Sequence, residues 1–162
     1  MVAEYDAKPR EIRNFVLVQL GLTTLFLLLL IWMFDGTDAD LPAIWLWVVV
    51  LVPVAVATFF AERVWLTTPA LRADDSDAQN AGLAIYAGQT VRKLAYCEAP
   101  ILWGVLWAFL SDNAAWPIII AGIPGLLILA FEIWPSPRNL SLTEAVLDSQ
   151  GASTQLINSF GR

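Results

Sequence analysis

Residues 15–34 of the chain read FVLVQLGLTTLFLLLLIWMF, a run of twenty positions without a charged side chain. A helix of about 20 predominantly apolar residues is long enough to cross the hydrocarbon core of a bilayer. We therefore predict that this stretch is a transmembrane helix. Since it is long and no small-residue cleavage site follows it, we interpret it as a retained anchor rather than a signal peptide.

The rest of the chain has the same apolar character. Of its 162 residues, 58% are hydrophobic, whereas a soluble domain is typically about 45–50% apolar. Three further segments are long and apolar enough to span a membrane: residues 43–60, 94–110 and 114–134. We predict an all-α, polytopic integral membrane protein, with four transmembrane helices in residues 1–134 and a C-terminal tail in residues 135–162.

The basic residues predict the orientation of these spans. All nine Lys and Arg residues lie before the first span, between the second and third, or after the fourth. The two remaining loops, residues 35–42 and 111–113, carry only Asp as charged side chains. Since Lys and Arg are retained on the cytoplasmic side, we expect both termini in the cytoplasm and a multi-pass protein of a bacterial plasma (inner) membrane.

Two capping patterns predict where further helices begin. Ser76 and Gln79 have the spacing of a capping box, so the third helix is expected to start near Asp77 and to extend from the cytoplasm into the membrane. A second capping box, Ser141 to Glu144, predicts a short helix in the tail. Helices this short are marginal alone, so we expect the tail to lie against the third helix or another protein.

The absence of several residue types excludes whole classes of chemistry. The chain has no His and only one Cys, so it lacks His axial ligands for haem and the ligands for a His/Cys zinc or copper site or an iron–sulfur cluster. It has no His general base for a Ser-His-Asp or Cys-His arrangement, and no Gly-rich phosphate loop. With a net charge of −6, nucleic acid is a disfavoured partner. We expect no enzyme activity, catalytic residue, metal, cofactor or nucleotide.

An acidic turn holds Asp35, Asp38 and Asp40. A calcium ion takes six to eight oxygen ligands, more than this turn alone offers, so we interpret it as a solvated loop. A lipid-modifying membrane enzyme would have to use these carboxylates, and it remains an alternative only on that basis.

Small residues four positions apart indicate where helices can approach closely. The pairs are Ala95 with Ala99, Gly104 with Ala108, and Ala121 with Gly125. The third and fourth spans are also joined by a minimal turn. We therefore predict that they form a tight antiparallel pair.

One carboxylate, Glu98, lies within the third span. It follows Lys93 by five residues, or about 7–8 Å along a helix axis, so it lies at a shallow depth. Ionisable residues in membrane spans usually pair, and we expect Glu98 to pair with Arg13 or Arg63. The hydroxyl groups of Tyr96 and Thr58 are alternative partners. A structural role for Glu98 is favoured, and a proton-carrying role is the alternative.

The run LAYCEAPILWGVLWAFL, residues 94–110, resembles the second helix of the ATP synthase proteolipid (c) subunits, in which a Leu-Ala-x-x-Glu-Ala motif carries the ion-binding carboxylate. The resemblance implies that Glu98 could carry a proton. It covers this one span only, and the partner helix in that family is rich in glycine, whereas the first span here contains only Gly21. We therefore do not assign the chain to that family.

Together these features predict a non-catalytic accessory subunit of a larger bacterial membrane complex, in contact with the lipid bilayer and with other integral membrane subunits. A respiratory-chain assembly is the first expected host, and an envelope lipid-transport assembly is the alternative. A small transporter or proton-conducting protein is a different alternative. It would use Glu98 and the proline-containing spans with Pro53, Pro100 and Pro124.

Overall fold

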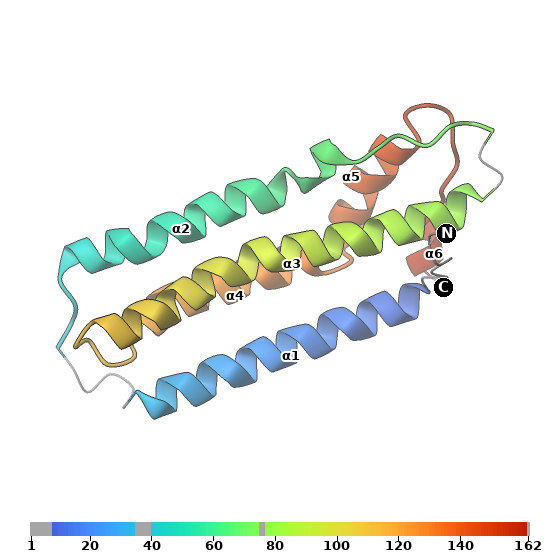
Figure 1. Cartoon of the computed structure of the whole chain (residues 1–162). Helices are drawn as coiled ribbons and strands as arrows, with labels where there is room; N and C mark the ends of the chain where they lie inside the picture. Colours follow the sequence, from blue (N-terminus) through green and yellow to red (C-terminus); the bar gives the residue numbers. More distant parts are fainter. Residues whose placement is uncertain (1–7, 35–39, 75–76, 162) are drawn as a thin grey trace, which may run out of the picture.

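The computed structural model describes residues 8–34, 40–74 and 77–161, and within these ranges every regular element is a helix (Figure 1). The elements in chain order are α1 (Pro9–Met33), α2 (Ile44–Glu62), the short 3-10 helix η1 (Val64–Thr67), α3 (Ala78–Leu110), α4 (Trp116–Ile133), α5 (Pro137–Leu147) and α6 (Leu156–Phe160).

Four of the helices, α1 to α4, are long and apolar enough to cross a membrane, which confirms the predicted all-α fold with four such segments. Helix α1 begins at Pro9, six residues before the predicted span. A proline suits the first helical position because the N–H that it lacks would have no partner there. Helix α3 begins at Ala78, next to the predicted start, and is 33 residues long, or about 50 Å.

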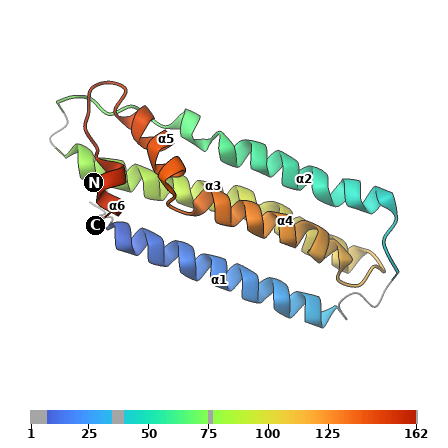
Figure 2. The ribbon, with the colours of Figure 1, turned by 180° about the vertical axis from the view of Figure 1, so that it is seen from behind.

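The long helices are arranged around a central pair. Helices α3 and α4 make the most extensive helix contact, while α1 and α2 lie on opposite sides of this pair (Figures 1 and 2). Half of the residues in the most apolar 18-residue stretch of α4 are buried, whereas 22% are buried in the corresponding stretches of α1 and α2. The two outer helices therefore leave most of their surface to the surroundings.

Small residues allow the central helices to meet closely. A Cβ atom added at Gly104 would lie 2.5 Å from the Cβ of Ala121 and 2.7 Å from the carbonyl oxygen of Pro117. A Cβ at Gly125 would lie 2.7 Å from Ile101 Cγ1. Ala108 is buried in the same contact region. Glycine at these positions lets the two backbones approach to a distance that any larger residue would prevent.

Ala95 and Ala99 were predicted to lie in a close helix contact, but both are exposed. The face of α3 that meets the other helices carries Cys97 and Ile101 instead. Each of these lies two positions after one of the alanines, which is about 200° around the helix. Small residues four positions apart therefore occur on two faces of α3, and only one of these faces packs against α4.

The tail folds back onto the first turns of α3. Helix α6 contacts α1 and α3, and α5 contacts α3, η1 and α6 (Figure 2). One buried apolar cluster joins these elements: Ile12, Leu83, Tyr86, Leu140, Leu156 and Phe160. A backbone hydrogen bond from the Leu71 N–H to the Leu147 carbonyl, 2.9 Å long, holds the segment after η1 against the end of α5.

The predicted start of the tail helix at Ser141 is wrong. Helix α5 begins four residues earlier, because Pro137 occupies its first turn and Ser136 caps it by accepting a hydrogen bond from the Asn139 N–H. Ser141 lies inside the helix, and its hydroxyl donates to the Arg138 carbonyl. Helix α6 was not expected from the sequence.

The close contact at Gly104 can be tested by adding a single methyl group. We expect Gly104→Ala to lower the free energy of unfolding by about 1–3 kcal/mol, since the methyl would collide with Ala121 and the Pro117 backbone. The matched control is Gly21→Ala, where an added Cβ meets nothing within 4 Å. It should be neutral or stabilising by up to about 1 kcal/mol. Denaturant unfolding in detergent, followed by circular dichroism, measures both. Equal effects of the two substitutions would contradict this account of the helix contact.

Candidate functional site

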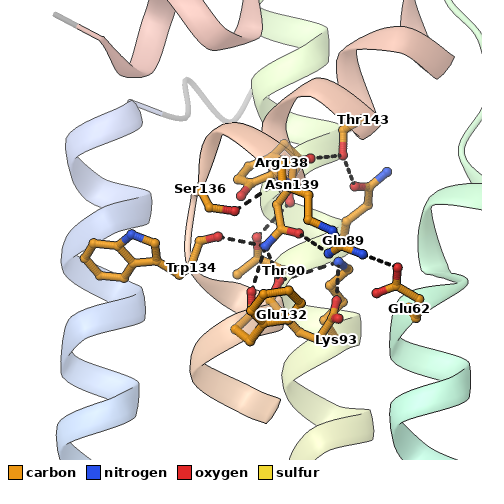
Figure 3. Close-up of polar contacts among 12 residues, drawn as sticks. Glu62, Gln89, Thr90, Lys93, Glu132, Trp134, Ser136, Arg138, Asn139 and Thr143 are labelled. Atoms are coloured by element: carbon orange, nitrogen blue, oxygen red, sulfur yellow. Dashed lines mark hydrogen bonds and ion pairs between the residues drawn. The ribbon is translucent and has the colours of Figure 1, made fainter. Parts of the chain in front are cut away.

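A buried ion pair lies where α3, α4 and the tail meet (Figure 3). Lys93 Nζ donates to Glu132 Oε2 over 2.7 Å, and only 10% of the lysine side chain and 2% of the glutamate side chain are exposed. A buried charge is costly unless it has an opposite charge and further hydrogen bonds. Lys93 Nζ also donates to the Glu132 carbonyl over 3.5 Å, and Asn139 of the tail donates to the same carbonyl.

Asn139 of α5 closes the end of α4. Its side-chain N–H groups donate to the carbonyls of Phe131, Glu132 and Trp134, at 3.0, 3.0 and 2.9 Å (Figure 3). The last carbonyls of a helix have no partner within the helix, so a side chain that reaches all three stabilises the end of α4. It also fixes the position of α5 on the bundle.

Gln89 extends the same network to the other side of the tail. Its side-chain oxygen accepts a hydrogen bond of 2.9 Å from Thr143 Oγ1 of α5, and its N–H donates to Thr68, the residue after η1. Gln89 and Thr143 are both buried. One polar network thus connects α3, α4, α5 and the segment that follows α2.

A second ion pair, between Arg138 and Glu62, lies at the edge of this region (Figure 3). The two side chains are 42% and 41% exposed. Exposed pairs contribute about 0–1 kcal/mol, so this pair adds little to the stability that the buried network provides.

Sequence reasoning missed the pair of Lys93 and Glu132. Lys93 lies beside Arg92 in the sequence and was therefore counted among the basic residues that flank the third span. A signal was present in Glu132, which interrupts an apolar run near the end of the fourth span. In an antiparallel hairpin of the third and fourth spans, that position falls at the level of Lys93.

The structure places Glu98 in a different cluster, between α3 and α1. Glu98 Oε1 accepts hydrogen bonds from Gln19 Nε2 at 2.6 Å and from Thr23 Oγ1 at 3.1 Å. Gln19 and Thr23 are four residues apart, one turn of α1, and so they face α3 together. The sequence contained this signal, as polar residues at helical spacing in an otherwise apolar span.

The expected ion pair of Glu98 with Arg13 or Arg63 is wrong for this structure. Arg13 donates to the Phe160 carbonyl of α6 over 2.6 Å, because the tail occupies the space around the start of α1. Arg63, the residue after α2, has its guanidinium over the ring of Phe59, 3.9 Å from its centre. Neither arginine forms an ion pair with Glu98.

Within the described residues, neither hydroxyl group named as an alternative partner forms a hydrogen bond with Glu98. Thr58 Oγ1 donates to the Val54 carbonyl one turn earlier in α2, over 2.8 Å. The ring of Tyr96 stacks on Phe60 of α2, with ring centres 6.0 Å apart. Both therefore belong to the side of the bundle that faces α2.

A cavity of about 200 Å³ adjoins the Glu98 cluster. Besides Gln19, Thr23 and Glu98, its walls are apolar and consist of Leu22, Phe26, Ile101 and Leu102. Glu98 itself is half-buried. This is the one described cavity whose lining combines a carboxylate, an amide and a hydroxyl group.

The described residues contain no group of three or more His, Cys, Asp or Glu side chains that could hold a metal ion. Of the acidic turn, Asp40 is described and exposed, while Asp35 and Asp38 lie outside the described residues, as does Ser76 of the first capping box. Cys97 is buried with a free thiol.

The fold defines a multi-pass helical membrane protein with a polar network under its tail and a separate polar cluster between α1 and α3. Comparisons of this chain with protein families, with characterised proteins and with solved structures gave no match.

The buried ion pair can be tested by removing one partner. We expect Lys93→Met to lower the free energy of unfolding by about 3–5 kcal/mol, because it leaves the carboxylate of Glu132 buried without a cation. Replacing both residues, Lys93→Met with Glu132→Leu, should recover most of that loss. The exposed pair is the control, and Arg138→Gln should cost no more than about 1 kcal/mol. A double variant no more stable than Lys93→Met would contradict the pairing.

Proposed function

We propose that the chain is a non-catalytic accessory subunit of a larger membrane complex. The observation that carries this proposal is that the polar network has structural partners throughout. Lys93 and Glu132 bind each other, and Asn139 and Thr143 bind backbone carbonyls and Gln89. Groups that bind one another in this way hold the tail on the bundle, which is a structural role.

The surface of α1 supports the same proposal. This helix has large exposed apolar side chains from Phe15 to Met33, among them Leu17, Leu25, Leu28 and Trp32. Its contacts within the chain are chiefly with α4, and few are with α3. A helix held on one side only is suited to contact a neighbouring subunit as well as lipid.

We further propose that both termini are cytoplasmic in a bacterial plasma membrane. The described Lys and Arg residues lie at the end of the bundle that bears α5 and α6, and the opposite end carries Asp40 and Asp112. This asymmetry supports the orientation through the positive-inside rule. Among hosts, a respiratory-chain assembly is the first candidate and an envelope lipid-transport assembly the second.

Labelling of single cysteines tests the orientation. In a Cys97→Ala background, a cysteine at the exposed position Asp112 should react with a membrane-impermeant maleimide added to intact cells, and a cysteine at exposed Ser149 should not. The second should react only after the membrane is opened. The reverse pattern would refute the proposed orientation.

Purification in a mild detergent tests the accessory role. We expect the full chain to migrate with one or more other membrane proteins at a fixed stoichiometry, which mass spectrometry of the purified complex would identify. A chain that migrates alone from native membranes would refute the proposal.

The rival function, proton conduction through Glu98, rests on the cavity next to that carboxylate. Vesicles reconstituted with the chain alone separate the two functions. In the proposed role, proton flux stays at background for both the native chain and Glu98→Gln. In the rival role, the native chain conducts and Glu98→Gln abolishes the flux.

A further inference from the structure

Two separate hollows lie between α1 and α3. One is the cavity at Glu98. A second hollow of about 320 Å³ lies closer to the tail, between Ile12 and Phe15 of α1 and Ala84, Ala87, Gly88 and Val91 of α3. We call the two hollows together the α1/α3 groove. Its lining is apolar apart from Glu11, Thr90 and the Glu98 cluster.

The α3 wall of this groove has the spacing of a helix-packing seam. Its outward-facing residues, with Ala95 between the two hollows, fall at intervals of four and three: Ala84, Gly88, Val91, Ala95, Glu98 and Leu102. All are exposed except Glu98, which is half-buried. Such alternation is the pattern by which one helix receives another along its length. From Ala84 to Leu102 it covers about 27 Å, close to the thickness of a bilayer core.

The floor of the groove has room for a backbone. Gly88 is a surface position where an added Cβ would meet nothing within 4 Å, and Ala84 and Ala95 carry only methyl groups. Ala95, which is exposed and does not contact α4, therefore belongs to this other face of α3. Small residues at such positions let another membrane helix come close.

The described lining of the groove lacks a positively charged side chain opposite Glu98. Both hydrogen bonds to this carboxylate come from neutral groups, and both end on Oε1. Within the described part of the chain, no Lys or Arg forms an ion pair with it. An ionised carboxylate among apolar walls is costly without a cation, so the occupant has to bring a positively charged donor.

We propose that the α1/α3 groove is the docking site for a transmembrane helix of another subunit, and that this helix carries a Lys or Arg opposite Glu98. The inference rests on the proposed accessory function and names the kind of partner. A second copy of this chain is the other outcome of the test, since α1 and α3 carry Arg10 and Arg92 at exposed positions toward the tail. An adduct with a second copy would overturn the proposal.

Photo-crosslinking in native membranes tests the docking site. A benzoylphenylalanine at Leu22 or Leu102, on opposite walls of the groove, should give an adduct with a membrane-spanning peptide that contains a Lys or Arg. Val52 of α2 and Leu127 of α4 are exposed elsewhere on the bundle and serve as matched controls. Mass spectrometry identifies the adducts. Lipid adducts alone at the groove positions, or the same protein adduct at all four positions, would overturn the proposal.

Substitution of Glu98 tests the ion pair itself. Glu98→Gln keeps an oxygen that accepts from Gln19 and Thr23, so the bundle should remain folded, while the yield of the adduct at Leu102 should fall by about 30-fold or more. Glu98→Lys should abolish the adduct, and an acidic residue in place of the partner's basic residue should restore it. An unchanged yield with Glu98→Gln would refute the ion pair.

The outcomes also separate this inference from the function on which it rests. If partners copurify at fixed stoichiometry but the groove positions give no adduct with them, the groove is not the docking site and the accessory role stands. If no partner copurifies and the groove positions react with lipid only, both proposals fail.

Discussion

The close approach of α3 and α4 is the contact around which the other helices are arranged. At Gly104 and Gly125 the space that a side chain would need is filled by Ala121, Pro117 and Ile101. Helices in lipid gain little from burial of apolar surface, because lipid chains are equally apolar, so close packing has to supply the attraction. Once α3 and α4 are in contact, α2 packs against both, and α1 packs mainly against α4. The gap beside α1 follows directly from that preference.

Helix α3 carries two charged groups with different roles, Lys93 and Glu98. They are five residues apart, which places them about 140° apart around the helix. Lys93 faces α4, where it donates to the carboxylate and to the backbone carbonyl of Glu132. Glu98 faces α1, where an amide and a hydroxyl group are its only hydrogen-bond donors in the described residues. One charge is therefore satisfied within the chain, and the other is satisfied only in part.

Features that depend on consecutive residues could be predicted from this sequence, and features that depend on helix rotation could not. The four apolar segments and the start of α3 near Asp77 belong to the first kind. The partner of Glu98 belongs to the second, since Gln19 and Arg13 are both on α1 and only the way α1 lies against α3 and the tail decides between them. The predicted start of the tail helix was wrong for a third reason. Two capping patterns overlap there, and the one at Ser136 prevails because Pro137 fits the first turn.

The tail network also has a consequence for the order in which the protein is made. Lys93 precedes its partner Glu132 by 39 residues, and Asn139 and Thr143 come later still. During synthesis the lysine therefore has no buried counter-charge until α4 exists, and the last carbonyls of α4 have no side-chain donor until α5 follows. The stable arrangement at this end of the bundle is thus available only after α5 has been added. The membrane helices therefore reach their final packing only once the tail is complete.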